Sequence, residues 1–265
     1  MSLFTGLRVA VTGGTSGLGL ALVDELHRQG AHVAFVARGR ERVERTAAAH
    51  PGTHGIVGDV SSKHAIYPMA LQILGVLGGL DILINNASDL GPVPLAHLGD
   101  TECEDLERAL ATNVIGPFRL TKALLGALAA SARNGTGAVV LNVSSDAAVN
   151  AYPTWGAYSA SKAALRHMTQ IWDAELAAEG IRLLSIDPGD MDTPMHALAV
   201  PDADPADLKR PETAARALLD AIAAALPVPV QSAAKAAPYE SVKSGRARLQ
   251  SRGRWGSSDL ESEVM

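Results

Sequence analysis

The chain of 265 residues is 47% apolar and carries a formal net charge of −5. This length and composition suit one α/β domain with a large core, and the mild negative charge gives no general attraction to nucleic acid or to an anionic membrane surface. Cys103 is the only cysteine, which excludes an intramolecular disulfide and a cysteine metal cluster.

The amino terminus lacks a charged start followed by an apolar run and a cleavage site, so we expect no signal peptide. No uninterrupted apolar run approaches the roughly 18 residues of a membrane span. We therefore expect a cytoplasmic protein without membrane or nucleic-acid partners. The histidines show no metal-ligand spacing, and we expect no metal.

Short apolar runs alternate with longer amphipathic ones along the chain. The expected strands are Leu7–Thr12, Ala31–Ala37, His54–Asp59, Leu80–Asn85, Gly137–Ser144 and Ile181–Ile186. The expected helices are Gly17–Gly30, Arg40–His50, Lys63–Leu77, Thr101–Ala130, Ala157–Leu176 and Pro211–Leu226. Strands that are apolar throughout and alternate with helices indicate a mainly parallel sheet covered by helices on both faces. We predict a single doubly wound Rossmann-type domain over residues 1–230, with its ligand crevice at the carboxyl ends of the strands.

Residues 231–265 differ in composition, and we expect them to form a separate C-terminal extension. Ser, Gly and Arg dominate, and a basic run precedes three acidic residues. This segment is either an arm that binds nucleic acid or a partner, or a flexible or subunit-docked tail. The second interpretation is favoured, because the run is short and contains few aromatics. Before it, Val228–Val230 could form a short edge strand.

A glycine-rich turn follows the first expected strand and leads into the first expected helix. Its glycines, Gly13, Gly17 and Gly19, allow a tight turn and a close approach of the backbone to a pyrophosphate, whose charge suits a helix N-terminus. No Gly-Lys-Ser/Thr sequence follows, which disfavours a nucleoside triphosphatase P-loop. The candidate cofactor-binding residues of the turn are Gly13, Thr15, Ser16, Gly17, Leu18 and Gly19.

Tyr158 and Lys162 lie four residues apart, which places them on one face of the expected helix. A phenol with a pKa near ~10 is a poor acid or base at neutral pH. A nearby ammonium favours the phenolate and would lower that pKa, as general acid–base catalysis requires. Alone, such a pair would in most cases be an ordinary exposed tyrosine and lysine on a helix. Tyr152 is a rival phenol, but it has no lysine four residues later.

Seven motifs occur together in one order along the chain. They are Thr12-Gly13-x-x-x-Gly17-x-Gly19, Asp59-Val60, Asn85-Asn86-Ala87, Asn113, Ser145, Tyr158-x-x-x-Lys162 and Pro188-Gly189. In these residues the chain resembles the classical short-chain dehydrogenase/reductase family. The resemblance implies a hydride transfer between a nicotinamide cofactor and a carbonyl or alcohol.

The resemblance also implies roles for four catalytic residues. Tyr158 would donate and accept the proton, while Lys162 would lower the phenol's pKa and hold the nicotinamide ribose. Ser145, rather than the adjacent Ser144, would donate a hydrogen bond to the substrate oxygen. Asn113 would bind a water that links Lys162 to solvent, although it could instead be a buried amide that satisfies helix backbone.

Further family positions concern the cofactor and the substrate. By resemblance, Asp59 and Val60 would border the adenine, Asn86 and Ala87 would line the groove, and Pro188, Gly189 and Thr193 would orient the nicotinamide amide. Residues 190–210 would form a flexible substrate loop, in which Met195, Leu198 and Val200 suggest an apolar wall. Ser88 replaces a glycine common in relatives, and an Asp-Gly-Gly common near their ends is lacking.

The end of the second strand indicates the cofactor preference. Ala37 stands where NAD-preferring relatives carry Asp, and Arg38 follows it. A guanidinium matches a 2′-phosphate, so we predict NADP(H) over NAD(H), unless Arg38 is an ordinary surface residue.

We therefore predict an NADP(H)-dependent carbonyl reductase or alcohol dehydrogenase. The alternative is a catalytically idle dinucleotide-binding sensor. By resemblance, we expect a homodimer or homotetramer, with dimer contacts through the helices Thr101–Ala130 and Ala157–Glu179.

Overall fold

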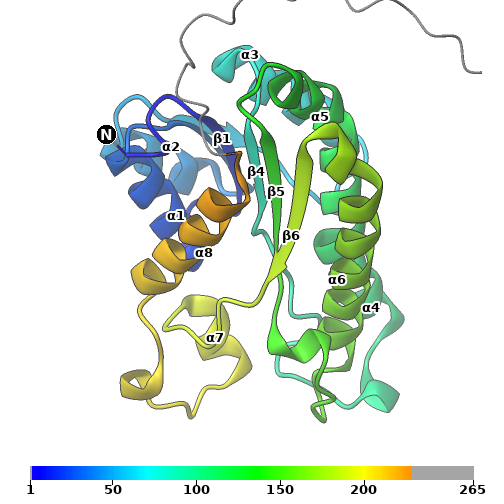
Figure 1. The fold of residues 1–265 in the computed structure, drawn as a ribbon. Coiled ribbons are helices and arrows are strands. Elements are labelled where there is room, and N and C mark those ends of the chain that lie inside the picture. Colours follow the sequence, from blue (N-terminus) through cyan, green and yellow to red (C-terminus); the bar gives the residue numbers. More distant parts are fainter. Residues whose placement is uncertain (1, 228–265) are drawn as a thin grey trace, which may run out of the picture. The chain divides into compact units, whose positions relative to one another are not determined.

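The computed structural model describes residues 2–227; the expected strand Val228–Val230 and the extension 231–265 lie outside the described residues. Its centre is a six-stranded parallel sheet with the order β3-β2-β1-β4-β5-β6 (Figure 1). The strands are β1 (Arg8–Thr12), β2 (His32–Ala37), β3 (His54–Val57), β4 (Ile82–Asn85), β5 (Ala138–Val143) and β6 (Ile181–Ile186). This order is that of a doubly wound Rossmann sheet, so the predicted fold class is confirmed.

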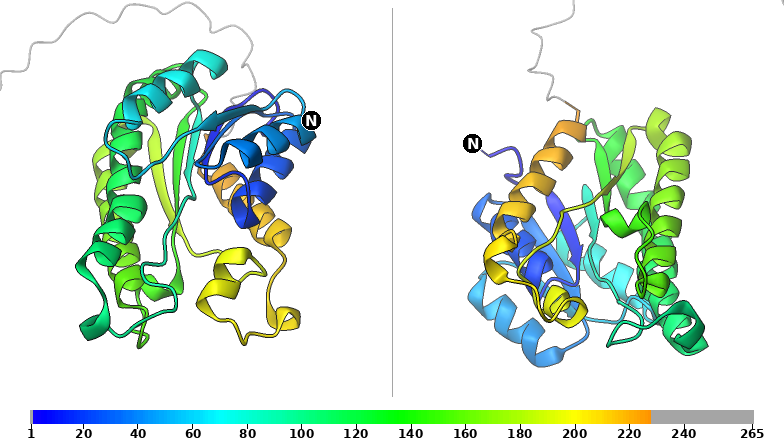
Figure 2. Two further views of the ribbon diagram at one scale, coloured as in Figure 1. Left: turned by 180° about the vertical axis from the view of Figure 1, so that it is seen from behind. Right: turned by 90° about the horizontal axis from the view of Figure 1, so that it is seen from below.

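Helices cover both faces of the sheet (Figure 2). They are α1 (Gly17–Arg28), α2 (Arg40–Ala49), α3 (Ile66–Leu77), α4 (Cys103–Leu110), α5 (Gly116–Arg133), α6 (Gly156–Leu176), α7 (Pro194–Ala199) and α8 (Pro211–Ala225). Neighbouring strand residues point to opposite faces: Val9 and Val11 pack in the core with α1 and α8, whereas Ala10 packs in the core with α3 and α5. Apolar residues on both sides of each strand therefore build two cores.

The expected single helix Thr101–Ala130 is wrong in one respect. A π-helical segment, Ala111–Ile115, separates α4 from α5. Gly116 follows it, and a Cβ at this glycine would lie 2.7 Å from the carbonyl oxygen of Val60. The chain therefore approaches the Val60 loop closely at this break, and the π segment places Asn113 in the buried interior.

By length and composition alone, the helical run Cys103–Arg133 could cross a membrane. Its leucines Leu120, Leu124 and Leu128 are instead fully buried, in the core that α3 and α5 form with one face of the sheet. The apolar character of this run is accounted for by its packing in the domain.

An ion pair ties β1 to β4 at the amino ends of the strands. The Asp81 side chain is 3% exposed and accepts hydrogen bonds from the guanidinium of Arg8, at 2.6 and 2.9 Å, and from the hydroxyl of Ser131. Burial alone would raise the pKa of Asp81, but the bonds from Arg8 and Ser131 outweigh it, so the pKa is lowered. The pair therefore stays charged and joins β1, β4 and α5.

Candidate active site

A cavity of about 1130 Å³ opens at the carboxyl ends of the strands, where the strand order reverses between β1 and β4. It extends from Arg38 past the glycine turn to Tyr158 and the residues after β6. Every residue predicted for cofactor binding lines it, as do Ser145, Tyr158 and Lys162. Asn113 alone among the predicted site residues does not line the cavity.

The glycine turn lies at the floor of this cavity and suits an anion. A Cβ at Gly19 would lie 2.1 Å from the carbonyl oxygen of Gly13, so this close packing requires glycine. In the described chain, the Ser16 side chain does not cap α1, and the first turn of the helix carries no acidic residue. The amides at the start of α1 are thus available to a phosphate, and these residues fit a dinucleotide.

The loop after β4 is fixed against the glycine turn. The hydroxyl of Thr12 accepts hydrogen bonds from the backbone amides of Asn86 and Ala87, at 3.0 and 3.1 Å. The Asn86 side chain donates to the carbonyl oxygen of Thr12 at 2.9 Å. These bonds fix Asn86 and Ala87, the two candidate cofactor-binding residues of this loop, against the glycine turn.

Two arginines, rather than one, face the cavity after β2. Arg38 and Arg42 both line it, and the guanidinium of Arg42 folds back over Gly39, where a Cβ would lie 3.2 Å from its Nε. Arg40 instead approaches Glu44 at 3.8 Å. The sequence analysis missed Arg42; its position in the first turn of α2, close in sequence to Arg38, was the available signal.

Tyr158 and Lys162 lie side by side on α6, and Ser145 follows β5. Tyr158 and Lys162 are both buried: 9% of Tyr158 and 2% of Lys162 are exposed. The Lys162 ammonium donates to the carbonyl oxygen of Val143 at 2.7 Å and lies 5.5 Å from the centre of the Tyr158 ring. The helix spacing therefore brings the pair together as expected, and the Val143 carbonyl directs the ammonium.

The pKa shifts of this pair differ from the sequence-based expectation. Burial raises the pKa of Tyr158 to about 12, against the opposing effect of hydrogen bonds with Ser145 and Ser88. Burial also lowers the pKa of Lys162 to about 8. Low polarity disfavours the charged form of either group, so in this state the phenol is held protonated instead of being activated by its neighbour.

Asn113 is a buried amide whose side chain bonds to the loop after β4 and to α6. Its amide nitrogen donates to the carbonyl oxygen of Asp89 at 2.7 Å and to the hydroxyl of Ser161 at 2.8 Å. Its amide oxygen accepts from the Asp89 amide at 2.8 Å and from the Ser88 hydroxyl at 3.1 Å. Both donor hydrogens and the acceptor are thus engaged, and the side chain fastens the loop after β4 to α6.

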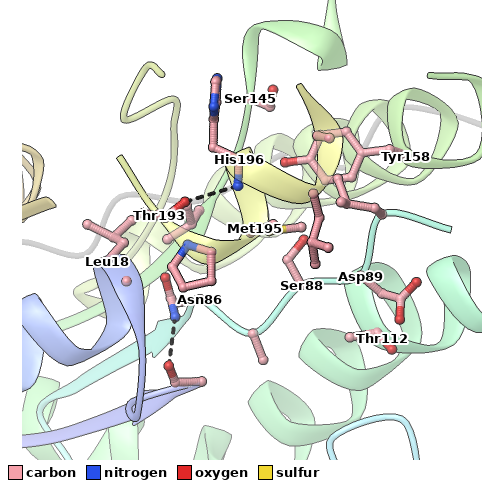
Figure 3. Close-up of a pocket in the computed structure, with 18 of the residues that line it drawn as sticks. Leu18, Asn86, Ser88, Asp89, Thr112, Ser145, Tyr158, Thr193, Met195 and His196 are labelled. Atoms are coloured by element: carbon pink, nitrogen blue, oxygen red, sulfur yellow. Dashed lines mark hydrogen bonds between the residues drawn. The ribbon is translucent and has the colours of Figure 1, made fainter. Parts of the chain in front are cut away.

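The predicted substrate loop contains a short helix and several hydrogen bonds. Thr193 caps the short helix α7 by accepting from the amide of His196 at 3.2 Å. At the base of the loop, Met191 pairs with Lys209, whose ammonium donates to the carbonyl oxygen of Pro188 at 3.3 Å. Figure 3 shows Thr193, Met195 and His196 reaching over the cavity between Asn86 and Tyr158.

This loop also contacts the glycine turn directly. A Cβ at Gly17 would lie 3.1 Å from the methyl group of Thr193. Besides Arg42, the cavity-lining residues that the sequence analysis did not assign to the site include Asp89, Leu90 and Trp155. Their positions depend on the loop conformations, which no local sequence pattern revealed.

Within residues 2–227, no group of three or more His, Cys, Asp or Glu side chains is placed to hold a metal ion. The charged residues that line the cavity are instead Arg38, Arg42, Arg108, Lys162 and several aspartates.

A family model described as short chain dehydrogenase matches residues 8–204. An uncharacterized oxidoreductase of Thermotoga maritima is 34% identical over 190 residues, which cover 70% of this chain and 72% of that protein. A 2-(R)-hydroxypropyl-CoM dehydrogenase of Xanthobacter autotrophicus is 31% identical over 194 residues, covering 71% of this chain and 76% of the relative. The match to an uncharacterized oxidoreductase of Mycobacterium tuberculosis, 34% identical over 197 residues, spans 72% of this chain and 56% of that protein's length.

Two solved structures share the fold. A 3-ketoacyl-(acyl-carrier-protein) reductase of Brucella melitensis in complex with NADH superposes with a TM-score of 0.76 and 26% identity, covering 82% of this chain and 90% of that one. A short chain dehydrogenase of Shigella flexneri in complex with NADP gives 0.74 and 27%, covering 80% and 88%. The neighbours thus include both cofactors.

Proposed function

The chain belongs to the short-chain dehydrogenase/reductase family, and on that premise we propose that it transfers a hydride between NADP(H) and a carbonyl or alcohol substrate. The observation that carries this proposal is the buried Tyr158–Lys162 pair, which faces a cavity lined by the glycine turn. When bound, the cofactor supplies or accepts the hydride.

Tyr158 acts as the general acid in reduction. Its pKa, raised to about 12 by burial, keeps the phenol protonated at neutral pH, so that a proton is available to the carbonyl oxygen. The hydroxyls of Ser145 and Ser88 both act to lower the pKa of the phenol, and in this state they donate to Asp146 and Asn113. Ser145 donates to the substrate oxygen as its negative charge grows, and Lys162 carries the positive charge nearest the phenol.

Asn113 is a positioning residue in this proposal. Its bonds to Ser88, Asp89 and Ser161 hold the loop after β4 against the helix that carries Tyr158. The role in binding a water beside Lys162 would then fall to backbone atoms of the π segment, because the Asn113 amide is already engaged.

We propose NADP(H) as the preferred cofactor. Arg38 and Arg42 supply two guanidinium groups at the end of the cavity beyond β2, where a 2′-phosphate would lie. Gly58, Asp59 and Val60 line the cavity beside them. The backbone near Pro188 and Gly189, with Thr193, lines the opposite part and is suited to orient the nicotinamide amide.

The test is a titration of purified protein with NADPH and NADH, followed by a screen of ketones and alcohols. We expect Arg38→Ala and Arg42→Ala each to raise the KM for NADPH about tenfold, as loss of a charge-assisted hydrogen bond would, and to leave the KM for NADH unchanged. Arg40→Ala is the matched control, because Arg40 lies beside Glu44. Tighter binding of NADH by the wild type would overturn the preference, and binding of NADPH without any turnover would favour the idle sensor.

We also propose a cytoplasmic homodimer or homotetramer that associates through α4, α5 and α6. Ile115 and Ile171, on the π segment and on α6, are 39% and 47% exposed, which supports an interface there. Light scattering on the purified protein tests the oligomeric state.

A further inference from the structure

An aromatic side chain that has no part in the proposed proton transfer lies beside Tyr158. Trp155 packs against the Tyr158 ring in an edge-to-face arrangement, with centroids 5.7 Å apart and planes at 65°. The indole is partly buried and lines the cavity. It is thus within reach of any substrate whose oxygen meets the phenol.

The backbone around Trp155 holds the indole in place. Thr154, just before it, has a φ of 72°, a conformation that β-branched residues rarely adopt. Gly156, just after it, packs so closely under Leu98 that a Cβ there would lie 2.3 Å from the Leu98 side chain. Trp155 is therefore positioned by a strained residue on one side and by a covered glycine on the other.

The surroundings of Trp155 in the cavity are apolar. Leu90, Met195 and Ala199 belong to the same cluster as Trp155 and Tyr158. All three line the cavity, and Leu198 and Val200 extend this lining along the substrate loop. An apolar substituent placed here would be removed from water, and an aromatic ring would also gain from edge and face contacts with the indole.

The charged groups near this wall are mostly acidic. Asp146, Asp187 and Asp190 line the same part of the cavity, and both Asp146 and Asp187 act on the phenol of Tyr158. Of the arginines in the lining, Arg38 and Arg42 lie beyond β2, and Arg108 is already engaged by Asp89 and Asp105, at 3.3 and 2.6 Å. An anionic substituent would therefore meet repulsion there without a free guanidinium to offset it among the described lining residues.

We propose that Trp155 is a specificity-determining residue, and that the substrate is an uncharged ketone or secondary alcohol with an apolar ring on the reacting carbon. This inference rests on the proposed function for the reaction, and on the wall formed by Trp155, Leu90, Met195 and Ala199 for the choice of substrate. Trp155 itself transfers no proton.

The test compares three ketones with NADPH: acetophenone, the small 2-butanone, and the anionic 4-acetylbenzoate. We expect the wild type to favour acetophenone over each of the others by about tenfold or more in kcat/KM. Trp155→Ala should lower kcat/KM for acetophenone about tenfold and change that for 2-butanone less than about twofold. For acetophenone, the kcat/KM of Trp155→Phe, which keeps a ring, should fall between those of the wild type and Trp155→Ala. The matched control is Tyr67→Ala on α3, because this tyrosine is 70% exposed.

A binding measurement separates this inference from the proposed function. Acetophenone is titrated calorimetrically into protein saturated with NADP⁺, a pair that cannot react, and Trp155→Ala should raise its Kd about tenfold. Loss of binding in the variant without any turnover by the wild type would support the inference and contradict the proposed reaction. The inference would be overturned if Trp155→Ala lowered kcat/KM equally for acetophenone and 2-butanone, or for neither. It would also be overturned if acetophenone did not bind, or if the wild type preferred 4-acetylbenzoate.

Discussion

At the amino ends of the strands, Asp81 and Arg8 are packed together and both are held in their charged forms. At the carboxyl ends, the Lys162 ammonium lies 5.5 Å from the centre of the Tyr158 ring, and burial drives both groups toward their neutral forms. The difference lies in the partners. Asp81 accepts bonds from a guanidinium and a hydroxyl, whereas within residues 2–227 the Lys162 ammonium donates to one carbonyl oxygen, that of Val143.

One end of the sheet thus carries a pair that stabilises the fold, and the other carries a pair suited to proton exchange. The buried charge of Asp81, whose hydrogen bonds are satisfied, joins β1, β4 and α5 and has little capacity to change its protonation state. A buried pair with incomplete partners has strongly shifted pKa values, which is the condition of groups that exchange protons. Substitutions at the first end should therefore change stability, and substitutions at the second should change activity.

The largest effect is expected for Tyr158→Phe. Removing the phenol oxygen removes the proposed general acid, and we expect kcat to fall by about 10²- to 10⁴-fold. The melting temperature should change little, because the ring and its contact with Trp155 remain. Steady-state kinetics on a confirmed substrate, with calorimetry on the same samples, would measure both. Full turnover by this variant, together with inactivity of Tyr152→Phe, would transfer the role to the rival phenol.

Asp81→Asn should have the next largest effect, on stability alone. The amide fills the same space but leaves Arg8 without its counter-charge, which should cost about 3 kcal/mol of unfolding free energy. Because its folded pKa is lowered, the contribution of Asp81 is present above the ordinary carboxyl pKa and is lost as the pH falls through the folded value. The difference between variant and wild type should therefore shrink below about pH 4.

Urea unfolding at several pH values measures this difference. Asp173→Asn is the matched control, because Asp173 pairs with Arg182 where the two side chains are 26% and 45% exposed, and such pairs contribute less than about 1 kcal/mol. The kcat of Asp81→Asn should equal that of the wild type. A large loss of kcat with unchanged stability would contradict the division between the two ends of the sheet.

Much of this architecture could be predicted from sequence, because it depends on local periodicity. Apolar runs such as Leu80–Asn85 identified all six strands, and a four-residue spacing placed Tyr158 beside Lys162. The glycine turn was equally accessible, since its conformation requires glycine at positions such as Gly19.

Features that depend on distant contacts could not be predicted. The π segment at Ala111–Ile115 accompanies bonds from Asn113 to a loop more than twenty residues away. The orientation of Trp155 depends on the backbone of Thr154. The direction of the Tyr158 pKa shift required knowing how deeply the phenol is buried, and the sequence showed only that a lysine was near.

The smallest of the three effects concerns the pH dependence of stability and tests Lys162. Its pKa is lowered from 10.5 to about 8 in the folded protein, so between these values the unfolded chain binds a proton that the native state has released. Stability should therefore rise with pH across this window, by about 2 kcal/mol between pH 8 and 9.5. The range stops short of pH 10, because the raised pKa of Tyr158 makes stability fall between 10 and about 12. Lys162→Met should lack this rise in stability with pH. The control Lys122→Met, which alters an exposed lysine on α5, should retain it. If stability rose with pH as steeply in Lys162→Met as in the wild type, the ammonium would stay charged in its buried position.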